Sequence, residues 1–95
     1  MRPVLASDLL CAGRAVLAAA PEARAALAGR LLQDADAADI FCQREGARHP
    51  DFGDGTLAAA ARGVGLAAEP TICDRDFAHA LVLVLMALIY HARDD

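Results

Sequence analysis

The feature that most constrains this fold is the segment Phe77 to Tyr90, in which nearly every side chain is apolar. Asp74 is suited to cap a helix that begins at Arg75 and continues to about Ala92. A helix that is apolar on all sides can rarely bury every face in a domain of 95 residues. We therefore expect it to be either the central helix of the domain or, in part, a subunit interface.

A second long helix is predicted from Pro21 to about Glu45, because proline suits the first helical position and Gly46 suits the end. Its apolar residues recur at steps of three and four, which gives one apolar stripe. We expect the protein to self-associate through the apolar surfaces of this helix and the last one. The interface residues that we expect are Leu31, Phe41, Leu81, Leu85 and Leu88.

Two shorter helices complete the predicted fold. One spans about Ser7 to Ala19, with Ser7 or its neighbour Asp8 as the cap. The other spans about Thr56 to Arg62, with Asp54 or Thr56 as the cap. Alanine is abundant and β-branched residues are few, which is typical of helical proteins.

The sequence therefore predicts an all-α fold in a single domain, residues 1–95. A helical hairpin with a long second helix is followed by a loop, a short helix and an apolar C-terminal helix packed along the hairpin. The longest apolar run, Ala80 to Tyr90, has eleven residues, whereas a membrane span needs roughly 20. The N-terminus lacks the pattern of a signal peptide. We expect a cytoplasmic protein without a membrane segment.

The loop "RHPDFGDG", residues 48–55, interrupts the helical pattern with proline, glycine and aspartate. A structural role is favoured, because proline fixes the backbone and glycine permits positive φ. Phe52 is expected to pack back onto the core and Asp54 to cap the following helix. The structural loop residues are thus Pro50, Phe52, Gly53, Asp54 and Gly55. Two alternatives are a weak metal site at His49, Asp51 and Asp54 and an anion site at the two glycine amides.

The charge is divided unevenly along the chain. The net charge is −4, but residues 1–33 hold four arginines against two acids, whereas residues 34–95 hold five arginines against eleven acids. An overall acidic balance argues against tight, non-specific binding to nucleic acid. Any contact with DNA is therefore expected in the N-terminal part, through Arg14, Arg24 and Arg30.

No residue pattern typical of catalysis or of a bound cofactor is present. Ser7 is the only serine and suits a helix cap, while His79 and His91 lie twelve positions apart on the apolar helix. Cys11, Cys42 and Cys73 lack zinc-ligand spacing, so we interpret them as small buried apolar residues. We expect no catalytic residue, no metal and no cofactor.

Four segments together resemble a group of short alphaproteobacterial proteins, the small terminase subunits of phage-like gene transfer agents. The segments are "RPVLASDL" (2–9), "HPDFGDGTLAAAA" (49–61), "AAEP" (67–70) and "DRDFAHALVLVLMAL" (74–88). The resemblance implies a non-enzymatic DNA-packaging adaptor that forms an oligomer, binds duplex DNA weakly and recruits the large terminase subunit.

Two features of the chain depart from that group. Many small terminases carry a separate helix-turn-helix domain, for which this chain has no room, and its acidic balance is unlike that of a strong DNA binder. DNA binding should then be weak, sensitive to salt and poor in sequence preference. The alternative is a small helical protein-interaction or regulatory module with no DNA role.

Overall fold

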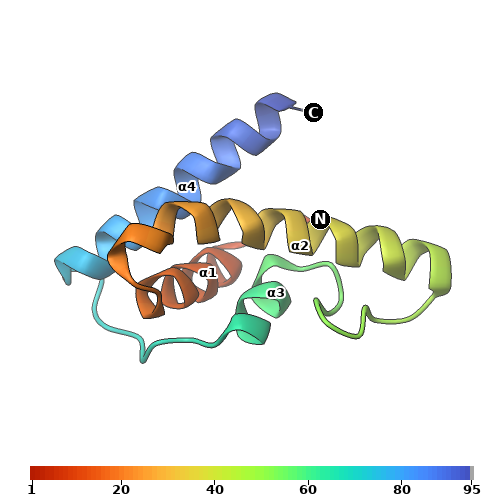
Figure 1. The fold of residues 1–95 in the computed structure, drawn as a ribbon, viewed down its shortest axis with the longest axis horizontal. Helices are drawn as coiled ribbons and strands as arrows, with labels where there is room; N and C mark the ends of the chain where they lie inside the picture. The colour runs from red at the N-terminus through yellow and green to blue at the C-terminus, as the bar shows by residue number, and fades with distance from the viewer. Residues whose placement is uncertain (95) are drawn as a thin grey trace.

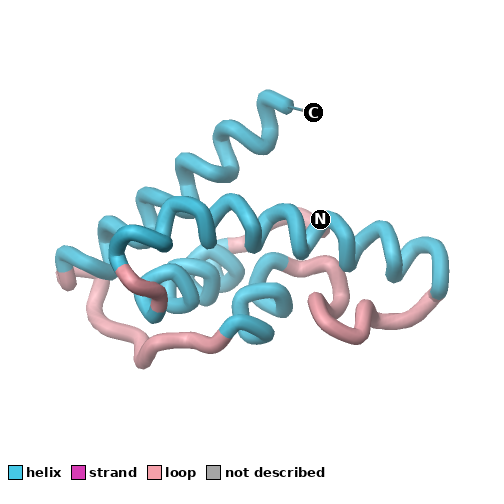
Figure 2. Tube along the Cα trace, viewed as in Figure 1, coloured by secondary structure: helices cyan, strands magenta, loops and turns pink. Residues whose placement is uncertain are grey.

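Four α-helices and one short 3-10 helix make up the chain in a computed structural model that describes residues 1–94 (Figures 1 and 2). The expected all-α fold is confirmed. The proposed single domain extends to Asp95, which lies outside the described residues. The elements are α1 (Ala6–Ala18), η1 (Pro21–Ala23), α2 (Arg24–Glu45), α3 (Leu57–Val64) and α4 (Arg75–Asp94).

Local signals define most of the helix ends where the sequence predicts them. Pro21 opens the 3-10 helix that turns the chain from α1 into α2. Gly46 ends α2 in the left-handed conformation, with φ of 68°. The side chain of Asp74 caps α4, because its Oδ1 accepts a hydrogen bond from the backbone N–H of Phe77 at 2.9 Å.

The first helix, and not the long second one, lies at the centre of the packing. α1 has its most extensive contacts with α4 and α3, and a smaller contact with α2. Its buried face consists of small side chains, which lets the other helices approach closely. The largest fully buried side chains of the domain come from all four helices: Val16, Leu31, Leu32, Leu57, Phe77 and Val84.

Gly13 marks the closest approach of α1 and α4. A Cβ atom at this position would lie 2.5 Å from Cδ2 of Leu81 and 3.2 Å from Cε1 of Phe77. The missing side chain therefore lets the N-terminal half of α4 pack against the backbone of α1. The C-terminal half of α4 crosses α2, with which it stays in contact, and its end projects beyond α2 (Figure 1).

A buried carboxylate joins the N-termini of α1 and α3. Asp8 is only 6% exposed. Its Oδ2 accepts a hydrogen bond from the backbone N–H of Leu5 at 2.9 Å, and its Oδ1 accepts one from Ala58 at 3.2 Å. The expectation that Ser7 or Asp8 caps α1 is met by Asp8, which acts from within the first turn. The bond to α3 connects residues 50 positions apart.

Replacing Asp8 should destabilise the fold strongly. Asp8→Ala leaves two backbone N–H groups without their acceptor, and we expect a loss of about 3 kcal/mol in the free energy of unfolding. Asp8→Asn keeps one acceptor oxygen and should lose less. Urea denaturation followed by circular dichroism measures both variants. Equal stability of Asp8→Ala and the wild type would contradict the role given to this carboxylate.

Candidate interaction surface

The loop between α2 and α3 is a closed turn held by its own histidine. The backbone of His49 pairs with that of Gly53 through two hydrogen bonds of 2.7 and 3.1 Å. Its ring Nδ1 also accepts hydrogen bonds from the backbone N–H groups of Asp51 and Phe52, at 3.0 and 3.1 Å. This ring nitrogen is therefore directed at the backbone of the loop.

Phe52 packs on His49 rather than on the hydrophobic core, which corrects the expected placement. The two rings are stacked, with centroids 4.7 Å apart and planes 16° apart. Phe41 of α2 contacts the His49 ring edge-on, with centroids 5.0 Å and planes 68° apart. The half-buried Phe52 thus anchors the loop to the end of α2 through the imidazole.

The cap of α3 is Thr56, and the carboxylate of Asp54 holds Thr56 in place through hydrogen bonds. Thr56 Oγ1 accepts a hydrogen bond from Ala59 N at 3.2 Å. The same hydroxyl donates to Oδ1 of Asp54 at 2.7 Å, and Thr56 N donates to this oxygen at 3.0 Å. Of the two caps that the sequence offered, Thr56 is confirmed and Asp54 is wrong, because the Asp54 carboxylate binds the capping residue instead.

The hydrogen bonds from Thr56 make the stability contributed by Asp54 depend on pH. They lower the pKa of Asp54 below its ordinary 3.8, first through the hydroxyl and then through the backbone N–H. A carboxyl group whose pKa is lower in the folded than in the unfolded chain stabilises the fold above its unfolded pKa. The contribution of Asp54 is therefore present at neutral pH and is lost as the pH falls below about 4.

Gly55 fits where a side chain has no room. Its φ is +94°, and a Cβ atom there would lie 2.9 Å from both Cα and Cβ of Asp39 on α2. The Gly55 carbonyl also accepts a hydrogen bond from Arg2 N at 2.9 Å. The loop is thereby fixed between α2 and the N-terminal segment, which supports the structural role predicted for it.

Gly55→Ala should be much more costly than the same change at Gly46. Both glycines have positive φ, but nothing lies within 4 Å of a Cβ at Gly46. We expect a loss of about 1 kcal/mol for Gly46→Ala from backbone strain alone. For Gly55→Ala we expect about 3 kcal/mol, because the strain adds to a clash with the α2 backbone. Urea denaturation distinguishes them, and equal losses would show that the loop is not packed as described.

Phe52→Ala tests whether the loop is structural or a binding site. Loss of the stacked ring should lower the free energy of unfolding by about 1 kcal/mol or more and leave self-association unchanged. Thermal denaturation and light scattering on the same samples measure the two effects. A variant that keeps its full stability but loses a partner or DNA would show that the loop is a binding site.

The side chains considered for a metal site do not converge. His49 Nδ1 is bonded to backbone N–H groups, and Oδ1 of Asp54 is bonded to Thr56. In the part of the chain that the structure describes, no group of three or more His, Cys, Asp or Glu side chains is arranged to hold a metal ion.

Two of the three arginines predicted to contact DNA bind carbonyl groups of their own chain. Arg14 Nε donates to the carbonyl of Ala67 at 2.9 Å, and so holds the segment between α3 and α4. Arg24 donates to Ala19 at 3.0 Å and to Leu17 at 2.9 Å, which satisfies the carbonyl end of α1. Arg30 lies exposed on α2. Arg14 and Arg24 therefore have structural roles that the sequence did not indicate.

An exposed apolar stripe follows the C-terminal half of α4. Its members are spaced at i, i+3, i+4, i+7 and i+8, so they share one face of the helix. Each is 44 to 60% exposed, and Ile89 and Tyr90 are the most exposed of them. We call this surface the α4 stripe: Val82, Leu85, Met86, Ile89 and Tyr90.

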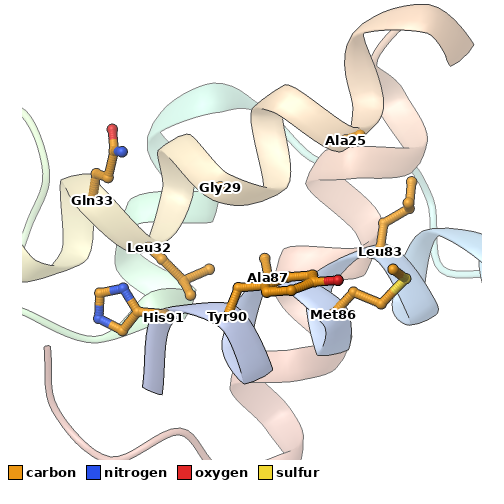
Figure 3. A pocket seen from close by; sticks show the side chains of 9 residues that line it. All are labelled: Ala25, Gly29, Leu32, Gln33, Leu83, Met86, Ala87, Tyr90 and His91. Carbon is orange, nitrogen blue, oxygen red and sulfur yellow. The ribbon is translucent and has the colours of Figure 1, made fainter. Parts of the chain in front are cut away.

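An open groove of about 360 Å³ runs beside the α4 stripe, between α2 and α4. Figure 3 shows Leu83, Met86 and Tyr90 on the α4 side of the groove, with the Tyr90 ring lying lengthwise along α4. The α2 side is shallow because two of its positions carry little or no side chain, Ala25 and Gly29. Among the residues whose side chains the structure describes, no Asp, Glu or Arg lines the groove; its lining is Ala25, Gly29, Leu32, Gln33, Leu83, Met86, Ala87, Tyr90 and His91.

A cluster of ionisable groups lies at one end of this groove. His91 Nε2 is 2.8 Å from Oδ2 of Asp36, which connects α4 to α2. The other oxygen of Asp36 accepts a hydrogen bond from the α-amino group of Met1, and Asp39 Oδ2 lies 3.5 Å from the same group. Burial lowers the pKa of this amino group, but the two carboxylates outweigh burial and raise it above 8.0.

The five predicted interface residues differ in exposure. Leu31 and Leu81 are buried in the core of the single chain, so their placement in a subunit interface is wrong. Phe41 is half-buried beside His49. Leu85 is exposed, and Leu88 is half-buried next to the core.

Gly29, which lines the groove, was not predicted from the sequence. A glycine inside a helix does not indicate whether the space next to it is open or filled.

The cysteines do not share one environment. Cys11 is buried, as expected, and its thiol lies 3.7 Å from the carbonyl of Ala58. Cys42 is half-buried, with its thiol 3.6 Å from the carbonyl of Gly53. Cys73 is exposed, in the segment just before α4, so the expectation that all three are buried is wrong for this one.

The fold and the surface together define a small helical domain whose most distinctive exterior features are a mainly apolar groove and an apolar stripe. Residues 2–88 match the family described as a domain of unknown function, DUF7742, and the chain belongs to that family. Neither a curated protein nor a solved structure matches the chain. Among the described residues, no helix has the length and apolar character that a membrane crossing requires.

Proposed function

We propose that this protein is a non-enzymatic DNA-packaging adaptor of the small-terminase kind, which acts in the cytoplasm. It self-associates, holds duplex DNA weakly and recruits a large terminase subunit. The α4 stripe is the observation that supports an adaptor best, because it contains large apolar side chains with no charged residue from Ala80 to Tyr90. The resemblance of four segments to small terminases supports the more specific role.

The exposed apolar patch on α4 supports a function in protein contact. The α4 stripe accounts for an apolar patch on the order of 500 Å², which is near the upper end for soluble monomers. The largest apolar patch of a soluble monomer is often a functional surface.

Arg30 is the best-placed of the predicted DNA contacts. It is exposed on α2, whereas the guanidinium groups of Arg14 and Arg24 bind carbonyls of the same chain. One phosphate contact per subunit gives weak binding, with a slope of about −0.9 in log affinity against log salt. An oligomer repeats this contact, and linked weak sites gain avidity.

The alternative is an interaction or regulatory module that does not bind DNA. The internal bonds of Arg14 and Arg24 favour this alternative, because they leave less positive charge for phosphate. Both functions require the α4 stripe. They differ in whether duplex DNA is a ligand.

An electrophoretic mobility shift with random duplex DNA across a salt series decides between the two. An adaptor that binds DNA should shift it at low salt, and its affinity for DNA should fall steeply as the salt concentration rises. Arg30→Glu should abolish the shift and leave the oligomer intact. Arg75→Glu makes the same charge change at an exposed position in the acidic half and should affect the shift less. Absence of any shift at low salt, or equal binding by Arg30→Glu, would contradict the proposed DNA contact.

A further inference from the structure

The groove between α2 and α4 is shaped by the absence of a side chain at Gly29. No atom lies within 4 Å of a Cβ at this position, so the space above the α2 backbone is open. Gly29 lies in the interior of α2, where glycine destabilises a helix by about 1 kcal/mol relative to alanine. The packing of the single chain gives no reason for a glycine here, in contrast to Gly13, where Leu81 would be 2.5 Å from a Cβ.

The same chain carries side chains that could fill such a groove. Leu85 and Ile89 are one helical turn apart on α4, and they are 44 and 60% exposed. Neither lines the groove of its own chain, which is bordered by Met86 and Tyr90 on the adjoining face of α4. The projecting half of α4 therefore presents two aliphatic side chains beside a groove that they do not occupy.

We propose that the groove receives α4 of a second copy of this chain, with Leu85 and Ile89 of one copy packed above Gly29 of the other. The inference rests on the proposed self-association and specifies its contact. A two-fold axis makes both halves equivalent, since each copy offers one groove and one pair of aliphatic side chains. Met86 and Tyr90 border the groove and also belong to the stripe, so groove and stripe form one continuous surface.

Area and charge favour a second copy as the occupant. Two α4 stripes of about 500 Å² each bury on the order of 1,000 Å², the lower limit of a specific interface. The chain carries a net charge of −4, so two copies repel each other unless they meet where no charge is concentrated. Among the residues whose side chains the structure describes, the groove lining contains no Asp, Glu or Arg, and its one histidine, His91, is already paired with Asp36.

Sedimentation equilibrium of three single variants tests this contact. Gly29→Glu places a charged side chain in the groove, and Ile89→Lys places one on the inserted helix. We expect each to raise the dissociation constant of the dimer at least about tenfold, equal to 1.4 kcal/mol. Ala37→Glu is the matched control, because it adds the same charge at an exposed site of α2 outside the groove. It should self-associate like the wild type.

Mixing the two charged variants gives a second measurement that does not depend on loss of function. Equimolar Gly29→Glu and Ile89→Lys should form a heterodimer. In one half of its contact the introduced glutamate meets the introduced lysine, and in the other half Ile89 meets Gly29 as in the wild type. Circular dichroism establishes that each variant is folded. Self-association that persists in both single variants would overturn this contact while leaving the adaptor role intact. A wild type that stays monomeric at micromolar concentrations would overturn both the contact and the proposed self-association.

Discussion

The buried carboxylate of Asp8 is the interaction on which the rest of the fold depends. A charged group in the interior is tolerated only when hydrogen bonds replace its water, and here backbone N–H groups of Leu5 and Ala58 supply them. The second bond fixes α3 against α1. With eight residues, α3 is too short to be stable alone. Its position in turn fixes the loop before it, where Thr56, Asp54 and Gly55 close the corner against α2.

The position of α1 at the centre leaves α4 with two different halves. Its N-terminal half is buried against α1 at Phe77 and Leu81, opposite Gly13. The domain is too small to cover the remainder, so the C-terminal half of α4 runs past α2 (Figure 1) with one face exposed, while Ala87 and Leu88 on another face pack against the core. The α4 stripe is thus the unburied continuation of a core helix. This arrangement explains why a short acidic chain has an uncharged surface suited to a protein partner.

The sequence predicted those features that depend on local signals. Helix ends at Pro21, Gly46 and Asp74 could be found because each acts on its own backbone neighbours. Long-range features could not be found in this way. Arg14 has the pattern of a solvated residue, yet it binds a carbonyl 53 positions away. Leu31 and Leu85 are indistinguishable by residue type, and only the packing buries one and exposes the other. The groove above Gly29 likewise exists only when α2 and α4 are side by side.

Hydrogen–deuterium exchange at low and high protein concentration tests the central claim, that the projecting half of α4 and the facing part of α2 form the working surface. Amides in segments 25–33 and 82–91 should become more protected as the concentration rises, because a second copy covers them. Segments 6–18 and 57–64, which belong to the interior of the single chain, should exchange at the same rate throughout. Protection that rises elsewhere, or at neither of the first two segments, would contradict the account.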